Sequence, residues 1–190
     1  MRRKDHKDFF STYKMHQTAR ENFLRFLHRY QQLIFTQGKV PRFLDVGSYN
    51  VNGTLKEDLI KFANEKGFRF EYIGMDMVAG NNVDVVNTSD DFPFGDGSFD
   101  VVVSSSCFEH DPCFWMTFKE MVRVLKRAGL MYIQAPAATP YHAYPIDCWR
   151  FFEDSWRALE KWCKNDVRLN ESYIDHRLPD RDSVGIYMRK

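Results

Sequence analysis

The segment at residues 42–54, RFLDVGSYNVNGT, constrains the fold of this chain most. Its apolar residues predict a buried strand that stops at Gly47, where a small residue lets the backbone approach a ligand. A second strand is predicted over residues 70–75 and delivers Asp76 to the same edge of a parallel sheet. A carboxylate in that place can accept hydrogen bonds from both hydroxyls of a ribose. The pattern therefore predicts half of a nucleotide-binding fold that holds adenosine.

A glycine after a strand often marks only a turn, so the first segment alone is weak evidence. Two further features follow in order. An acidic, turn-rich stretch at residues 87–99 leads into a predicted strand at 100–104, and a predicted helix ends at Gly129 before a buried strand at 130–136. Strands and helices that alternate in this way predict a parallel sheet with right-handed crossovers.

Together these features resemble the class I S-adenosylmethionine-dependent methyltransferases of the type 11-like group. That group shows LDVG, an acidic strand end, LPF, SFDVV, EH and LKPGG, and the resemblance spans residues 42–136. It implies an α/β, Rossmann-like fold with a mostly parallel seven-stranded sheet, an antiparallel last strand and helices on both faces. It also implies S-adenosylmethionine as the cofactor.

The resemblance implies a role for individual residues of the cofactor site. Asp45 and Gly47 match positions that contact the methionine part of the cofactor, and Asp76 matches the acid that binds the ribose. The remaining matches are Ser48, Tyr49 and Asn50 in the turn, Met77 against the adenine ring, Thr88, Ser89 and Asp90 at the adenine edge, and Ser104 beside the methionine and sulfonium.

The turn departs from the family pattern. Tyr49 and Val51 stand where the family has a second and a third glycine. A bulkier turn can narrow the pocket, which leaves open a methyltransferase-like protein that is not catalytic and works with a partner. A nicotinamide-dependent oxidoreductase would need G-x-G-x-x-G after the first strand, and the chain lacks it.

The stretch at residues 135–152, APAATPYHAYPIDCWRFF, is the predicted acceptor loop. His142 is the candidate general base because imidazole titrates near neutral pH, with Tyr141, Asp147 and Arg150 as orienting groups. In the alternative, Asp147 and Arg150 pair with each other or cap the next helix, and Trp149, Phe151 and Phe152 fill the core. The loop resembles a YP-x-D-x-W-R-F segment of methyltransferases from sugar pathways, which implies a sugar-derived hydroxyl as the acceptor.

His110 belongs to the EH pair and is a second catalytic candidate. A hydrogen bond to a nearby backbone group is the favoured interpretation of its role. A metal site of His110, Asp111 and His142 is conceivable, but the three residues lack a recognisable ligand spacing, so no metal is expected.

Length and composition predict one domain of 190 residues. Within it we expect an N-terminal helical cap at 1–38, a cofactor-binding core at 39–136, and the acceptor loop with a last helix and strands at 137–190. A net charge of +1 argues against nucleic acid, and no apolar run approaches the roughly 20 residues of a membrane helix, so the expected partner is a small-molecule acceptor. Four cysteines without CxxC spacing, and no signal peptide, predict a cytoplasmic protein with reduced thiols. The oligomeric state stays open.

Apolar spacing predicts the remaining elements. The aromatic residues before the first helix form either a lid over the cofactor or part of the core, and they are Phe9, Phe10, Tyr13 and His16. The predicted helices are residues 16–35, 54–66 with Gly67 as its end, 112–126 with Asp111 as its N-cap, and 153–164, and further strands are predicted at 83–86, 166–174 and 184–188.

Overall fold

The structure is a computed structural model and describes residues 17–51, 53–164, 166–177 and 181–190. The four residues predicted to form a lid or part of the core lie outside the described residues: Phe9, Phe10, Tyr13 and His16.

A seven-stranded sheet forms the centre of the fold, in the order β3-β2-β1-β4-β5-β7-β6. β7 is antiparallel to both of its neighbours, and the other pairs are parallel. This confirms the predicted mostly parallel sheet with an antiparallel last strand. The strands are β1 (Arg42–Val46), β2 (Glu71–Asp76), β3 (Val85–Val86), β4 (Phe99–Ser105), β5 (Leu125–Ala138), β6 (Val167–Asp175) and β7 (Arg181–Arg189).

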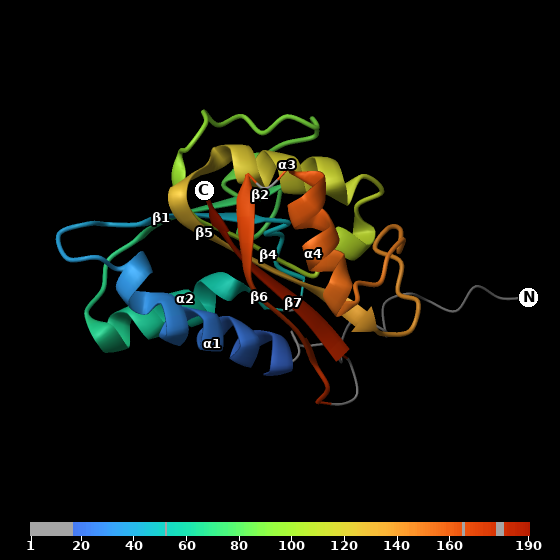
Figure 1. The fold of residues 1–190 in the computed structure, drawn as a ribbon, viewed down its shortest axis with the longest axis horizontal. Coiled ribbons are helices and arrows are strands. Elements are labelled where there is room, and N and C mark those ends of the chain that lie inside the picture. Colours follow the sequence, from blue (N-terminus) through green and yellow to red (C-terminus); the bar gives the residue numbers. More distant parts are fainter. Residues whose placement is uncertain (1–16, 52, 165, 178–180) are drawn as a thin grey trace, which may run out of the picture.

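Helices cover both faces of the sheet, as predicted. α1 and α2 lie side by side on one face, and α3 and α4 lie on the other (Figure 1). None of the described helices is long and apolar enough to cross a membrane. The helices are α1 (Gln17–Ile34), α2 (Leu55–Lys66), α3 (Phe114–Val124) and α4 (Glu153–Trp162), with a short 3-10 helix, η2 (Phe108–His110), after β4.

Each face of the sheet has its own apolar core. Under α1, Phe23 and Phe26 pack on the buried Tyr132 of β5, with ring centroids 5.5 and 5.1 Å away. Under α4, Trp156 stacks on Phe151 with centroids 5.3 Å apart. The sheet is therefore fixed from both sides, and its strand ends can hold side chains in place.

The first crossover helix begins and ends as predicted. The Thr54 hydroxyl accepts a hydrogen bond from the Glu57 N–H, which caps the start of α2. Gly67 takes the left-handed conformation, with φ 69°, and its N–H reaches back to the last turn.

The prediction for α3 is wrong at both ends. Asp111 is not its N-cap, because the helix begins at Phe114 after a turn in which the Asp111 carboxylate accepts the Cys113 N–H. The helix ends at Val124 and not near Gly129, which lies inside β5. A Cβ on Gly129 would come within 2.9 Å of the Asp100 carbonyl oxygen, so this glycine serves close approach of two strands and not a helix end.

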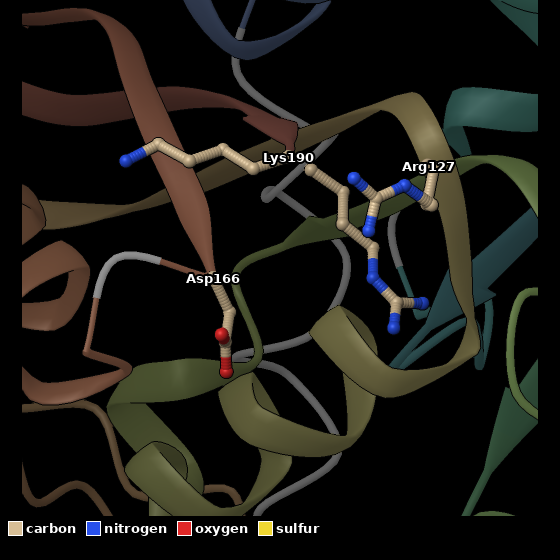
Figure 2. Close-up of a pocket in the computed structure, with 4 residues that line it drawn as sticks. Arg127, Asp166 and Lys190 are labelled. Carbon is tan, nitrogen blue, oxygen red and sulfur yellow. The ribbon is translucent and has the colours of Figure 1, made fainter.

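The amino ends and the carboxyl ends of the parallel strands carry different residues. The amino end of β5 and the end of β7 carry a polar pocket lined by Arg127, Asp166, Arg189 and Lys190 (Figure 2). The predicted site residues lie at or after the opposite, carboxyl ends of β1, β2, β3, β4 and β5. Ligands of open α/β sheets bind at carboxyl ends, so the candidate site is sought there.

Candidate active site

The turn after β1 depends on a glycine. Gly47 has φ 78°, and its N–H and that of Ser48 both donate to the Met75 carbonyl, at 2.9 and 3.1 Å. A Cβ on Gly47 would lie 2.5 Å from the Cys107 Sγ. The residue therefore has to be glycine both for its backbone angle and for the close approach of the chain that leaves β4.

The rest of the turn is bound to the loop between β2 and β3. The Ser48 hydroxyl donates to the Asn82 carbonyl at 3.0 Å, and the Asn82 side chain donates to the Ser48 carbonyl at 2.9 Å. The ring of Tyr49 covers Gly80, where an added Cβ would meet it at 1.9 Å, and the Asn50 N–H donates to the Asn81 carbonyl. The bulky residue at the usual glycine position thus packs against a neighbouring loop.

Asp76 stands at the carboxyl end of β2 with its carboxylate fixed. One oxygen accepts the Tyr49 N–H at 3.0 Å, and the other accepts the Val78 N–H at 3.1 Å. A carboxylate offers about four acceptor positions, so each oxygen can still take a further donor. This geometry suits a ligand with two adjacent hydroxyls.

Asp45 is buried beneath the surface of the site, unlike Asp76. It accepts a hydrogen bond from the Tyr72 hydroxyl, which in turn accepts one from the Asn82 side chain at 3.2 Å. Burial raises the pKa of Asp45 to about 6, against the Tyr72 hydrogen bond, which favours the ionised form. Asp45 therefore helps to fix the loop that Asn82 belongs to.

The other predicted cofactor residues differ in exposure. Met77 is 68% exposed, so its apolar side chain is free to cover a flat ring. Thr88, Ser89 and Asp90 are exposed in the loop after β3. Ser104 is fully buried and donates to the Val46 carbonyl at 2.9 Å, so its hydroxyl proton joins β4 to β1.

Glu109 is the buried centre of a second group of residues, after β4. Its side chain is 1% exposed, and its Oε2 has no hydrogen-bond partner among the described residues. Its Oε1 lies 3.7 Å from the Nε2 of His110. Burial raises the pKa of Glu109 to about 8.

Two histidine rings meet beside Glu109. His110 and His142 pack edge to face, with centroids 5.2 Å apart. The Nδ1 of His110 lies 2.6 Å from the Ile146 carbonyl oxygen, which confirms the favoured prediction of a backbone hydrogen bond. The Nδ1 of His142 lies 2.9 Å from the Pro140 carbonyl oxygen. Burial lowers the pKa of His110, which favours the neutral ring.

Asp147 and Arg150 shape the acceptor loop. Two hydrogen bonds of 2.5 and 2.7 Å join them, and this pairing lowers the pKa of Asp147. Asp147 also accepts the backbone N–H of His142 at 2.7 Å, and Arg150 donates to three loop carbonyls, those of Thr139, Pro140 and Trp149. The predicted alternative, in which the two residues pair with each other, is confirmed.

Most of the aromatic residues of this loop face solvent. Phe151 is buried, as the alternative expects, but Trp149 and Phe152 are 38% and 62% exposed. The prediction that all three fill the core is therefore wrong for two of them. Tyr141, a predicted orienting group, is 77% exposed near the tip of the loop.

Sequence reasoning missed three residues that matter to this geometry: Tyr72, Cys107 and Glu109. Glu109 could have been found, because it belongs to the EH pair that the sequence already shows. Nothing in the spacing of Tyr72 or Cys107 indicated their contacts with Asp45 and Gly47.

A family described as "Methyltransferase domain" matches residues 38–133, half of the chain. The chain belongs to this family. It is an S-adenosylmethionine-dependent methyltransferase, and its sheet order is that of the class I fold. No curated protein sequence matches it.

Solved methyltransferases share the fold at low sequence identity. The methyltransferase has a TM-score of 0.62 and 16% identity to a SAM-dependent methyltransferase from Archaeoglobus fulgidus, covering 97% of this chain and 100% of that one. It has a TM-score of 0.65 and 16% identity to the 1,6-didemethyltoxoflavin-N1-methyltransferase from Burkholderia thailandensis, covering 97% and 82%. It has a TM-score of 0.61 and 16% identity to a putative sarcosine dimethylglycine methyltransferase from Galdieria sulphuraria, and the match covers 91% of this chain and 85% of that one.

The carboxyl edge of the methyltransferase fits its cofactor. Gly47 has no side chain, so the turn packs closely against Cys107. The fixed carboxylate of Asp76 keeps acceptor positions for two hydroxyls. The ring of Tyr49 packs against Gly80 of the loop between β2 and β3.

Proposed function

We propose that the enzyme methylates a hydroxyl of a small-molecule acceptor, derived from a sugar. The observation that carries this proposal is the histidine pair of His110 and His142. His110 lies three residues after Cys107, the residue that packs against Gly47 of the turn. A hydroxyl is a poor nucleophile until its proton is removed, and a neutral imidazole next to the cofactor can remove it.

On the cofactor side, we propose that Asp76 binds the ribose hydroxyls and that the turn holds the methionine part. When bound, S-adenosylmethionine supplies an electrophilic methyl group on its sulfonium. The proposed cofactor residues are Gly47, Ser48, Tyr49, Asn50, Asp76, Met77, Thr88, Ser89 and Asp90. The buried Asp45 supports them through its hydrogen bond with Tyr72, and Ser104 supports them by joining β4 to β1.

On the acceptor side, His142 takes the proton from the hydroxyl. Its Nδ1 faces the Pro140 carbonyl, so the hydrogen resides there and Nε2 keeps its lone pair for the substrate. Asp147 holds the backbone N–H of His142 in place, and Arg150 holds Asp147. His110 packs on His142 and fixes the orientation of its ring, while Tyr141 contacts the acceptor from the loop tip.

The exposed aromatic residues support the sugar-derived acceptor. Tyr141, Tyr144, Trp149 and Phe152 are all at least 38% exposed on the loop that follows β5. Aromatic rings offer an apolar face with a polar edge, which suits the mixed surface of a sugar ring. The solved relatives named for toxoflavin precursors and for sarcosine favour the small-molecule class.

We further propose one domain with three parts: a helical cap at 1–38, the cofactor core at 39–136 and the acceptor part at 137–190. Family membership favours an active enzyme over the alternative that is not catalytic and works with a partner.

The test is formation of S-adenosylhomocysteine in the presence of free sugars, sugar nucleotides, amines and a protein or RNA control. Turnover should appear with a hydroxyl acceptor, and His142→Ala should lower it by about 100-fold or more, the usual contribution of a general base. The matched control is His28→Ala, which removes an exposed histidine of α1. Turnover only with amines or macromolecules would contradict the acceptor class, and unchanged turnover in His142→Ala would remove it as the base.

A further inference from the structure

Glu109, His110 and His142 place three ligand-type atoms together, one from each residue, all within 4.8 Å of one another. The first two residues follow β4 and the third follows β5, so the group forms only when the sheet has formed. Glu109 and His110 are adjacent, but His142 lies far along the chain from both, so no ligand spacing is visible in the sequence.

Both histidines are oriented as metal ligands usually are. A backbone carbonyl only accepts hydrogen bonds, so the Nδ1 atoms that face Ile146 and Pro140 carry the hydrogens. The lone pair of each ring is then on Nε2. Arg150 also approaches the Nδ1 of His142, but at the longer distance of 3.5 Å. A ligating histidine typically donates its other N–H to a carbonyl or carboxylate in this way.

Glu109 supplies an independent indication of a bound cation. It is 1% exposed, and its Oε2 lacks a hydrogen-bond partner within the described part of the chain. Buried polar atoms are almost always satisfied, and one that is not calls for an explanation such as an ion. The nearby guanidinium of Arg150 forms two bonds with Asp147, so its charge is balanced there.

We propose that Glu109, His110 and His142 bind a divalent transition-metal ion, of the zinc or ferrous type. Two imidazoles and one carboxylate form the donor set of such sites when a position is kept open for substrate, whereas magnesium and calcium prefer oxygen ligands. Bond lengths of about 2.1 Å place tetrahedral donors about 3.4 Å apart. Glu109 Oε1 and His110 Nε2 are already 3.7 Å apart, and His142, on an exposed loop, closes the remaining distance.

The role of the ion rests on the proposed function. The acceptor oxygen takes the open position, where the ion lowers the pKa of its hydroxyl. The hydroxyl proton goes to water, the oxygen forms the bond to the methyl carbon, and the electron pair of the broken carbon–sulfur bond stays on sulfur. With the ion bound, His142 is a ligand and water takes the proton. Without the ion, His142 takes the proton itself.

The test uses the full chain after treatment with a chelator, titrated with zinc in a calorimeter and with cobalt by visible absorption. One equivalent should bind, with the absorption bands of a tetrahedral site. Glu109→Gln, His110→Ala and His142→Ala should each weaken zinc binding by more than about 100-fold, the upper end of the effect of altering an outer-shell partner. His28→Ala, Cys113→Ser and Cys148→Ser are the controls, because exposed thiols could also bind zinc.

Failure of this inference can be told apart from failure of the proposed function. S-adenosylhomocysteine binding is measured on the same samples, and Asp76→Ala should weaken it by about 5- to 150-fold while keeping the zinc site. No saturable zinc binding, or binding that only the cysteine variants weaken, would overturn the metal site even if turnover is intact. Zinc binding that depends on the three ligands supports the metal site even if hydroxyl acceptors fail.

Discussion

Two aspartates of the cofactor site differ in their surroundings. Asp76 is half-buried and accepts two backbone N–H groups, whereas Asp45 is buried and bonded to Tyr72. Desolvation raises the pKa of Asp45 from 3.8 to about 6. The carboxylate of Asp76 is therefore accessible to a ligand. The carboxylate of Asp45 is held inside the site, and its ionisation there destabilises the folded protein.

Asp45→Asn should stabilise the folded protein at neutral pH. Because the folded state keeps the Asp45 proton up to about pH 6 and the unfolded state releases it near pH 4, this residue's contribution is fully present below pH 4 and is lost as pH rises to 6. Asparagine avoids that loss and still accepts the Tyr72 hydroxyl. The expected gain is about 1–3 kcal/mol at pH 7.5 and close to zero at pH 4.

Urea unfolding of both proteins at the two pH values measures the difference. A gain of the same size at both values would show that ionisation of Asp45 is not its cause, and a loss at pH 7.5 would contradict the account of this residue.

At the residue scale, the sequence predicted site residues that lie next to a strand end in the chain. It missed groups of residues that come together only through contacts across the sheet. Gly47 and Asp76 directly end predicted strands, so their place at the carboxyl edge could be predicted. His142 is brought to the adjacent Glu109 and His110 only through the pairing of β4 with β5, which explains why the sequence indicated no metal spacing.

At the scale of elements, the acceptor loop depends on how α4 is seated on the sheet. Trp156 of α4 donates to the Ser183 hydroxyl at 2.8 Å and stacks on Phe151, the buried residue that ends the loop. Gly185 of β7 lies under the same indole. The packing of one helix against one strand thus fixes the end of the loop.

Gly185→Ala should destabilise this contact. The new Cβ would lie 2.7 Å from the Trp156 ring, so the indole or the strand must shift. Overpacking of this kind costs about 1–3 kcal/mol in the free energy of unfolding. Gly95→Ala is the matched control, since its Cβ would meet nothing closer than the Ser98 hydroxyl at 3.6 Å. Equal unfolding free energies for the two variants in urea would contradict the proposed seating of α4.

The elements themselves could largely be predicted from apolar spacing, and their exact ends could not. Thr54 and Gly67 are strong local signals, and α2 begins and ends beside them. The LKRAG stretch at residues 125–129 has the sequence of a helix end. In the structure it belongs to β5 from Leu125 onward, because β5 pairs with β4. Tertiary pairing decided this boundary against the local sequence.

At the scale of the whole molecule, two apolar cores fix a sheet whose strands carry different groups at their two ends. The amino edge carries the polar pocket around Arg127 and Lys190, and the carboxyl edge carries the glycine turn, Asp76 and the histidine pair. The mostly parallel sheet with its antiparallel last strand and the family were both predicted from four short motifs, because those motifs mark the ends of the strands. The acceptor could not be predicted in the same way, since it depends on side chains of one exposed loop.

We expect the carboxyl edge to bind the cofactor through Asp76. Calorimetric titration with S-adenosylhomocysteine tests it, on the unaltered enzyme, on Asp76→Ala and on Asp96→Ala, a control at an exposed carboxylate that pairs with Arg123. We expect one saturable site that Asp76→Ala weakens by about 1–3 kcal/mol, or about 5- to 150-fold in Kd, and that Asp96→Ala leaves unchanged. No saturable binding by the unaltered enzyme, or equal binding by Asp76→Ala, would contradict the account.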